Sequence, residues 1–298
     1  MTVCARCREK AIFQTLKGPL CRKHFSEWYE RGVVATVEKY GMISPRERIC
    51  VGFSGGKDST VLLAVLAKRN FDAELIAVTV DEGIRGYRDD TIEAAKITAK
   101  NLDVELHIIS FRDVAGGTLD ELLAPAPNRA CSVCGTLRRH ALNTVARKLD
   151  VDKIATGHCL DDEAQSVVMN YLRGDITRIT SSFNSNSAGL FIPRIKPLFR
   201  STERATVSYG LANRLLTPLP ECSYTRFALR KDVRTFLGKC EHSTPGTLLR
   251  IVEGQERLTA MLPKPNGMLI NLHPCENCGE PTANRLCAAC QHLEFLLH

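Results

Sequence analysis

The sequence of 298 residues lacks any apolar run near the roughly 20 residues that a helix needs to cross a bilayer. Its first eight residues also lack the apolar core of a secretory signal peptide. Aromatic residues make up only 6%, with a single tryptophan, whereas hydrophobic residues make up 44% and charged residues 24%, as in ordinary folded proteins. We therefore expect a cytoplasmic, globular chain with no membrane partner.

The sequence has an excess of positive charge and an unusually large number of cysteines. The formal net charge is +7, which suits a polyanionic partner but is also common among enzymes. There are 13 cysteines. In a cytosolic chain such a number predicts metal or redox chemistry before it predicts disulfides.

Seven of the cysteines form paired knuckles near the two ends of the sequence. Two residues between ligands let a tight turn direct both side chains at one tetrahedral ion, and two such knuckles complete four ligands. Because each set is complete without water, both predicted zinc ions are structural rather than catalytic. The predicted ligands are Cys4, Cys7, Cys21 and His24 for the first zinc, and Cys275, Cys278, Cys287 and Cys290 for the second.

A third group of cysteines has no complete ligand set. Cys131 and Cys134 form a single knuckle, and the next candidate, Cys222, lies far along the chain. Three thiolates suit either an iron–sulfur cluster with one exposed iron or a redox pair with a helper thiol, and spacing alone does not choose. Cys50 lies in an apolar strand pattern and is predicted to be a packed thiol, while Cys240 is left unassigned.

The pattern at residues 48–67 predicts a phosphate site. Residues 48–53 are typical of a buried strand, residues 54–59 read Ser-Gly-Gly-Lys-Asp-Ser, and residues 60–67 are typical of a helix. Gly55 and Gly56 allow the backbone to approach an anion that the amides of a helix N-terminus can receive. Asp58 and Ser59 fall in the first turn, where they can hold magnesium and phosphate. The spacing of a Walker loop is absent.

Further strands and helices alternate along the chain. Strands are predicted at 74–80, 104–109 and 153–158, and helices at 89–102, 131–149 and 162–172. This alternation predicts an α/β fold with a doubly wound parallel sheet. Because ligands bind beyond the carboxyl ends of such strands, the loop at 54–59, the strand at 78–80 and residues 157–162 should line one crevice.

Together these motifs resemble one family over nearly the full length. The loop is similar to the PP-loop of ATP pyrophosphatases, and the remaining motifs resemble those of the tRNA 2-thiouridine synthetases, the TtuA group with the related Ncs/Ctu wobble-uridine thiolases. The matching motifs are both knuckle pairs, Cys131-Ser-Val-Cys134-Gly followed by two arginines, TGHCLDDEAQ at 156–165, Arg-Gly-Asp at 173–175, and Cys222. The resemblance implies a zinc finger at 1–30, a PP-loop catalytic domain with a helical C-terminal part at 31–270, and a second zinc finger at 271–298.

The resemblance also implies roles for individual residues. Cys131, Cys134 and Cys222 would hold a 4Fe-4S cluster, whose free iron site carries the sulfur. ATP, with Mg²⁺, would contact Phe53, Ser54, Gly55, Gly56, Lys57, Asp58, Ser59, Val78, Val80 and Gly157. The catalytic group would comprise Asp58, Arg138, Asp161, Asp162, Cys131 and Cys222.

Two positions depart from the TtuA pattern. Arg138-Arg139 stands where many TtuA-like proteins have Lys-Arg, and a guanidinium is too basic to shuttle a proton. Cys159 stands where the family usually has asparagine, which indicates a simple replacement more than a reactive thiol.

Basic residues predict where tRNA binds, although a solvated basic face would look the same in sequence. One set surrounds the first zinc site and a second recurs at helical spacing. These are Arg6, Arg8, Lys10, Lys17, Arg22 and Lys23, and then Arg226, Arg230, Lys231 and Arg234.

The predicted reaction is ATP-dependent 2-thiolation of a tRNA uridine. Uridine O2 would be adenylated and then replaced by sulfur, which must come from a persulfide, free sulfide or a ubiquitin-like thiocarboxylate carrier. The Thr-Pro-Gly-Thr string at 244–247 favours the T-loop uridine, with the wobble uridine as the alternative. A homodimer is expected because relatives form one.

Three other interpretations stay open on the sequence. A PP-loop enzyme that forms amides would not need the three central cysteines, and a non-catalytic zinc-knuckle RNA-binding protein would not need the PP-loop. Thiolation through a disulfide or persulfide relay between Cys131 and Cys222 would need no cluster.

Overall fold

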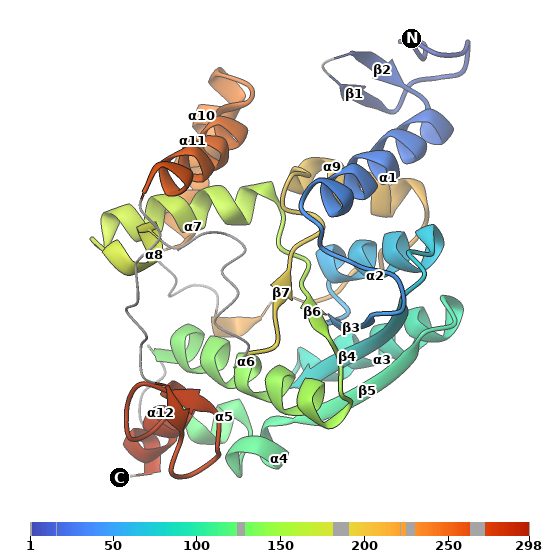
Figure 1. Cartoon of the computed structure of the whole chain (residues 1–298). Coiled ribbons are helices and arrows are strands. Elements are labelled where there is room, and N and C mark those ends of the chain that lie inside the picture. The colour runs from blue at the N-terminus through green and yellow to red at the C-terminus, as the bar shows by residue number, and fades with distance from the viewer. Residues whose placement is uncertain are drawn as a thin grey trace.

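A five-stranded parallel sheet forms the centre of the protein, with strand order β5-β4-β3-β6-β7 (Figure 1). The computed structural model describes residues 2–15, 17–123, 129–180, 191–220, 222–224, 230–262 and 272–297. From β3 the chain continues to β4 and β5 at one edge of the sheet and later returns to β6 and β7 on the other side of β3. The loop after β3 therefore lies at the topological switch point. The strands are β3 Arg48–Gly52, β4 Glu74–Asp81, β5 Glu105–Ser110, β6 Lys153–Ala155 and β7 Arg194–Ile195.

The predicted doubly wound fold is confirmed, because separate cores cover the two faces of the sheet. Ile49 and Val51 on β3 face one core, and Cys50 between them faces the other, as the period of a strand requires. The first core includes α1 Arg22–Lys39, α2 Lys57–Arg69, α3 Arg88–Asn101 and α9 Glu203–Ala212. The second includes α4 Phe111–Ala115, α5 Leu119–Leu122 and α6 Ala130–Lys148.

A helical layer lies beyond the edge of the sheet that β7 forms. Its long helix α7 packs against α8 and against the antiparallel pair α10 and α11 (Figure 1). None of the helices that the structure describes has the length and apolar character needed to cross a bilayer. The bounds are α7 Leu160–Leu172, α8 Ile176–Thr180, α10 Arg230–Ser243 and α11 Thr247–Met261.

The two cysteine knuckles lie at opposite corners of the molecule (Figure 1). The first, with β1 Phe13–Thr15 and β2 Gly18–Leu20, adds Cys4 and Cys21 to the first core and runs directly into α1. The second, with β8 His273–Pro274, β9 Pro281–Thr282 and α12 Ala288–Leu297, adds three cysteines to the second core. Each knuckle therefore extends the hydrophobic core on its own side of the sheet.

A buried carboxylate joins the second knuckle to α6. Glu280 is 6% exposed and accepts hydrogen bonds from Asn143 Nδ2 at 2.6 Å and from Arg147 Nη2 at 2.5 Å. His140 Nδ1 lies 3.6 Å from the same carboxylate. Burial raises the pKa of Glu280, but the contacts with His140, Arg147 and Asn143 outweigh it and hold the pKa at about 2. This side chain fixes the knuckle against the middle of α6.

We expect Glu280→Ala to lower the free energy of unfolding by about 1–3 kcal/mol, because it leaves the partners on α6 without their acceptor. The measurement is urea unfolding followed by circular dichroism. Glu276→Ala is the matched control, because its exposed ion pair with Arg285 at 3.3 Å should contribute less than about 1 kcal/mol. Equal losses in the two variants would contradict the anchoring role of Glu280.

Candidate active site

The PP-loop follows β3 and is held by its own side chains. Gly55 has φ +78°, and a Cβ there would lie 2.3 Å from the carbonyl oxygen of Thr91, so the position requires glycine. Ser54 Oγ lies 3.1 Å from Ser59 Oγ and accepts a hydrogen bond from the Gly56 amide at 3.3 Å. Because the first amides of an α-helix have no partner within the helix, this turn presents donors to an anion.

Helix α2 begins at Lys57, three residues before the predicted start, with Gly56 as its N-cap. The prediction that Asp58 and Ser59 lie in the first turn is therefore confirmed. Ser59 Oγ donates to the carbonyl of Gly56 at 2.9 Å, which closes the loop onto the helix.

The loop after β6 presses directly on the first turn of α2. A Cβ on Gly157 would lie 3.0 Å from Asp58 C and from Ser59 N. Both of these atoms belong to the backbone, so they cannot move aside as a flexible side chain would. Gly157 thus allows the two loops of the crevice to approach closely, as the predicted assignment of this glycine to the ATP site requires.

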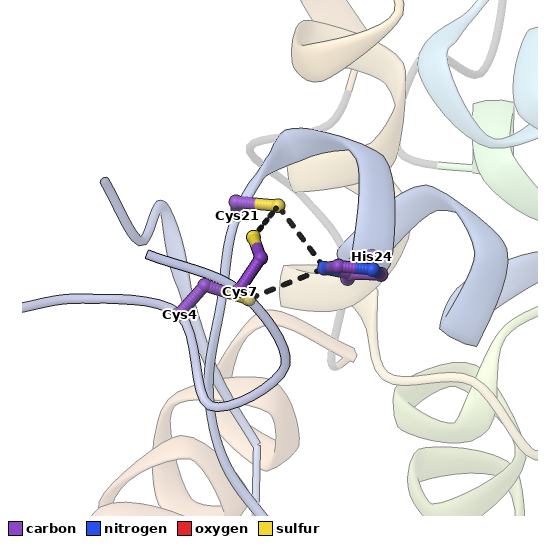
Figure 2. Close-up of side chains that lie close together, drawn as sticks. All are labelled: Cys4, Cys7, Cys21 and His24. Carbon is purple, nitrogen blue, oxygen red and sulfur yellow. Dashed lines mark hydrogen bonds between the residues drawn. The ribbon is translucent and has the colours of Figure 1, made fainter. Parts of the chain in front are cut away.

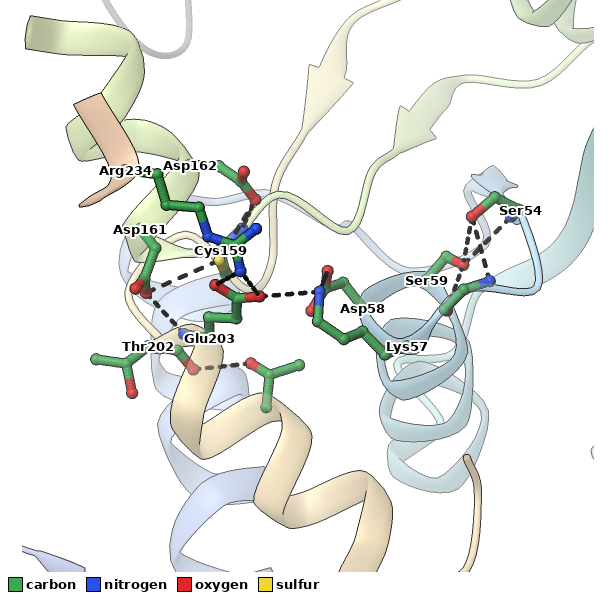
Figure 3. Close-up of polar contacts among 12 residues, drawn as sticks. Ser54, Lys57, Asp58, Ser59, Cys159, Asp161, Asp162, Thr202, Glu203 and Arg234 are labelled. Atoms are coloured by element: carbon green, nitrogen blue, oxygen red, sulfur yellow. Dashed lines mark hydrogen bonds and ion pairs between the residues drawn. The ribbon is translucent and has the colours of Figure 1, made fainter. Parts of the chain in front are cut away.

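Acidic and basic side chains alternate across the crevice (Figure 3). Lys57 Nζ lies 2.8 Å from Asp58 Oδ2 and 3.0 Å from Glu203 Oε1. Glu203 also pairs with Arg234 Nη2 at 2.7 Å, and its backbone amide donates to Asp161 Oδ2 at 2.7 Å. Burial alone would lower the pKa of Lys57, but Asp58 and Glu203 raise it, so this lysine stays charged.

One oxygen of Asp58 is suited to a cation. Asp58 Oδ1 is buried and has no hydrogen-bond partner among the residues the structure describes. Burial raises the pKa of Asp58, Lys57 lowers it in part, and Asp162 and Glu203 raise it further. Burial likewise raises the pKa of Asp161. Carboxylates that repel one another beside a phosphate loop are the ligands that Mg²⁺ uses together with ATP, so the residues present fit this ion.

Cys159 is the N-cap of α7 and is only 2% exposed. Its Sγ lies 3.3 Å from Asp162 Oδ2. Burial raises the pKa of the thiol, and Asp162 and Asp161 raise it further, so it stays protonated. A buried, protonated thiol is a poor nucleophile, which supports a simple replacement over a reactive cysteine.

A chain of ion pairs links the PP-loop to the central cysteines. Glu82 at the end of β4 pairs with Arg88 Nε at 2.7 Å and with Arg138 Nε at 2.9 Å. Arg88 Nη1 donates to the carbonyl of Ser54 at 3.2 Å, and Arg138 Nη2 donates to Cys134 Sγ at 3.2 Å. Glu82 and Arg88 are each 2% exposed. Sequence reasoning missed both residues, although Glu82 directly follows a predicted strand.

Of the residues that the resemblance assigns to ATP, Val78 and Val80, which would hold its adenine, lie on β4, and Phe53 directly follows β3. Phe53, Val78 and Val80 are all buried. The carbonyl of Val78 accepts from the Phe53 amide at 2.8 Å, and the carbonyl of Val80 accepts from Arg88. Contact of this strand with adenine stays a prediction.

The three central cysteines come together around the start of α6. Cys131 Sγ lies 3.7 Å from the carbonyl of Tyr224, two residues after Cys222. Burial raises the pKa of both Cys131 and Cys134; Cys222 adds to this in both thiols, and Arg138 opposes it. The hydroxyl of Tyr224 donates to Asp120 at 2.9 Å and holds this segment.

The three thiols are not packed as tightly as ligands of one ion, since only the two terminal sets in the described part of the chain have all ligand atoms within 4.8 Å. A cluster binds its cysteines through different irons, so wider spacing suits it. Three cysteines at one place therefore fit a 4Fe-4S cluster with one iron that lacks a cysteine ligand.

The second predicted basic stripe lies on α10 beside the crevice. Arg226 lies outside the described residues, and Arg230, Lys231 and Arg234 lie on α10. Arg230 Nη1 lies 3.6 Å from Asp162, and Arg234 pairs with Glu203. Two of these cations therefore pair with carboxylates of the crevice, although Arg234, like Lys231, stays exposed to solvent.

Both terminal sets have the geometry of a single-ion site. Figure 2 shows the first, in which Cys4 Sγ and Cys21 Sγ each lie 3.4 Å from His24 Nδ1 and Cys7 Sγ lies 3.6 Å from Cys21 Sγ. In the second, Cys278 Sγ lies 3.5 Å from Cys287 Sγ. Zn–S bonds of about 2.3 Å in a tetrahedron separate neighbouring sulfurs by about 3.8 Å, so both sets fit Zn²⁺.

Comparisons with known proteins agree with this geometry. A family described as the PP-loop domain matches residues 27–216. The cytoplasmic tRNA 2-thiolation protein 1 of Aspergillus niger is 38% identical over 303 residues, which cover 98% of this chain and 88% of the relative. The tRNA 2-thiolation protein NcsA of Haloferax volcanii is 34% identical over 318 residues, which cover 98% of both chains.

A solved structure is similar over the whole molecule. The U34-tRNA thiolase NcsA from Methanococcus maripaludis, determined with its 4Fe-4S cluster, superimposes with a TM-score of 0.84 at 31% identity. The similarity covers 99% of this chain and 97% of that one.

We expect Gly157→Ala to weaken ATP binding at least about tenfold, because the added methyl group displaces the backbone of Asp58 and Ser59. Equilibrium binding of ATP with Mg²⁺ is the measurement. Gly238→Ala is the matched control, since a Cβ at that helical position meets nothing within 4 Å. Unchanged affinity in Gly157→Ala would show that this contact does not shape the site.

We expect purified protein to contain two zinc ions per chain and Cys7→Ser to contain one, because a knuckle with three ligands binds zinc weakly. Elemental analysis by mass spectrometry measures the ratio. Cys240→Ser, which changes a cysteine on α10 outside both sets, should keep both ions. Two zinc ions in Cys7→Ser would refute the assigned ligand set.

Proposed function

The chain belongs to the PP-loop family of tRNA 2-thiolation enzymes, and from this premise we propose that it adenylates a uridine of tRNA and replaces its O2 with sulfur. The observation that carries the proposal is a series of hydrogen bonds and ion pairs that connects Ser54 to Cys134 through Arg88, Glu82 and Arg138. It joins a loop suited to ATP to cysteines suited to a cluster, and neither an amide-forming enzyme nor a passive RNA-binding protein needs that connection.

Activation of the uridine falls to the crevice. Uridine O2 attacks the α-phosphorus of ATP, pyrophosphate leaves, and the base loses its N3 proton as the C2–O–P linkage forms. Amides at the start of α2 and the hydroxyls of Ser54 and Ser59 would bind the departing pyrophosphate. Asp58 Oδ1 would hold Mg²⁺ against the phosphates, and Lys57 would keep this carboxylate in place.

Replacement of the oxygen requires a soft sulfur nucleophile near C2. Hydrosulfide adds to C2, the C2–O2 bond breaks, AMP leaves with that oxygen, and N3 regains a proton. A 4Fe-4S cluster on Cys131, Cys134 and Cys222 would supply a metal site for such sulfur when it is bound.

Arg138 would act in this step through its permanent positive charge. Its guanidinium donates to Cys134 Sγ and pairs with Glu82, which fixes it at the rim of the cysteine group. Burial alone would lower the pKa of Arg138, but Cys134 and Glu82 raise it, so it attracts anionic sulfur or phosphate and does not serve as a base.

The target and the context of the reaction are also proposals. The sequence favoured the T-loop uridine on a string that forms the turn between α10 and α11. The name of the structural relative specifies U34, and its similarity covers 99% of this chain, so we now propose the wobble uridine. We further propose a cytoplasmic enzyme, as the names of the relatives indicate, that works as a homodimer and takes its sulfur from an external donor.

The test uses the full chain reconstituted anaerobically with its metals. It is incubated with ATP, Mg²⁺, sulfide and unmodified tRNA, and nuclease fragments are analysed by mass spectrometry. We expect 2-thiouridine in the anticodon fragment only when ATP is present. We expect Cys222→Ser to lose at least about 100-fold in product while Cys159→Ser, a buried thiol outside the cluster, keeps its activity.

Each other outcome has a defined meaning. Full formation of 2-thiouridine by Cys222→Ser would refute a role for Cys222 in sulfur transfer, and ATP turnover by the wild type without any thionucleoside would favour amide chemistry. Product that forms without iron would favour a persulfide relay. Activity that survives Asp58→Ala would refute the PP-loop as the site of activation, and product in the T-loop fragment would refute U34.

A further inference from the structure

A cavity of about 850 Å³ lies outside the ATP crevice, at the β7 edge of the sheet. Residues of β7, α6, α7, α8, α11 and the second zinc knuckle line it, and none of them belongs to the PP-loop or is a predicted cluster ligand. Asp161 and Asp162 at the start of α7 face the crevice, whereas Glu163 and Ser166, up to one turn further, face the cavity. The two spaces therefore adjoin along α7.

Two arginines bring positive charge into this cavity without a carboxylate partner. Arg139 Nη2 donates to Thr136 Oγ1 at 3.3 Å, and Arg194 Nη2 donates to Asn143 Oδ1 at 2.7 Å and to the carbonyl of Arg139 at 3.4 Å. Within the described ranges neither guanidinium forms an ion pair, whereas the cavity's Lys196 pairs with Glu163 at 2.9 Å.

The two guanidinium groups also repel each other and a third. Burial lowers the pKa of Arg139, and Arg178 and Arg138 lower it further. Burial lowers the pKa of Arg194, and Arg139 lowers it further, against weaker opposing effects of Cys50 and Glu280. Arginine stays protonated regardless, so α6, β7 and α8 each hold a cation where like charges oppose one another. An anion bound between Arg139 and Arg194 would relieve this repulsion.

The other residues that line the cavity indicate which kind of molecule would carry the anion. Side-chain amides of Asn170 and Asn284 and the ring of Phe191 line the same space, whereas the amide of Asn143 already bonds to Glu280 and Arg194. Amides that hydrogen-bond base edges, a ring that stacks on a base and arginines that bind phosphate are the combination by which proteins recognise unpaired RNA. A volume of this size is also ample for a nucleotide.

We propose that this cavity binds an unpaired nucleotide of the substrate RNA, with its phosphate between Arg139 and Arg194 and its base among the amides and Phe191. The inference rests on the proposed function, since it assigns the place where RNA next to the target uridine is held. Arg139 belongs to this site because α6 divides its faces. Positions 131, 134 and 138 serve the cysteine group, whereas positions 136, 139, 140 and 143 line the cavity.

The test measures RNA binding alone, without ATP or sulfide. Binding of fluorescent unmodified tRNA to the metal-loaded full chain is followed by anisotropy between about 50 and 200 mM salt. We expect Arg139→Ala/Arg194→Ala to bind about tenfold more weakly, with a salt slope smaller by about 0.7 for each phosphate that the protein no longer neutralises. Arg139→Lys should keep most of the slope because it keeps the charge. Lys100→Ala, which removes one exposed cation on α3 at the far side of the sheet, is the control for net charge.

The outcomes separate this inference from the proposed function. Affinity and slope equal to those of Lys100→Ala, in double variants whose zinc content and unfolding midpoint are unchanged, would overturn it. Loss of inorganic phosphate binding by calorimetry with unchanged RNA binding would also overturn it, because the cavity would then be a small-anion site. If the wild type forms no 2-thiouridine but the arginines still control RNA binding, the proposed function fails and the cavity assignment stands.

Discussion

The buried carboxylate of Glu82 is the constraint on which the rest of the site depends. A carboxylate that is 2% exposed is unfavourable unless cations compensate it, and here Arg88 pairs with one of its oxygens and Arg138 with the other. Because Arg88 also holds the carbonyl of Ser54 and Arg138 also contacts Cys134, compensation of one charge fixes the positions of two functional groups. Removal of both arginines would leave this buried charge unpaired, which typically costs about 3–5 kcal/mol.

Helix α6 connects the sheet to the periphery of the molecule. Its apolar side packs on the sheet, where Leu142 lies 3.5 Å from the position of a Cβ on Gly52. Two of the central cysteines lie at its start, and side chains further along it bind Glu280 of the second zinc knuckle. A structural zinc site distant from the ATP crevice can therefore influence chemistry by fixing the helix that carries Cys131 and Cys134.

The sequence predicted best what local spacing determines. The strand, turn and helix around residues 48–67 and both knuckles need only near neighbours, and the structure places them as predicted. Strand β6 is three residues shorter than predicted, because the chain turns at Gly157 to meet α2. Pairings between distant segments could not be read from one sequence. Thr202, directly before Glu203, is a recognisable helix N-cap in the sequence. Nothing in the sequence, however, predicts that Glu203 lies beside Lys57.

The same limit explains why charge patterns were harder to interpret than cysteine spacing. The stripe on α10 has the spacing of an RNA-binding face, yet Arg230 and Arg234 neutralise Asp162 and Glu203 in the crevice. Conversely, Arg139 and Arg194 are 55 residues apart and form no stripe, yet they meet in one cavity.

The two sites thus differ in charge. The crevice gathers the carboxylates of Asp58, Asp161, Asp162 and Glu203, three of which pair with Lys57, Arg230 or Arg234, and this mixed set suits a magnesium–nucleotide complex. The cavity along the same helix α7 has two arginines that pair with no carboxylate of the described chain, and these attract an RNA backbone. If RNA phosphates are held in the cavity, an uncharged part of the neighbouring nucleotide is free to reach the α-phosphorus of ATP in the adjoining crevice. The separation of phosphate binding from the crevice along one helix would then present an uncharged group of the RNA, rather than a phosphate, for activation.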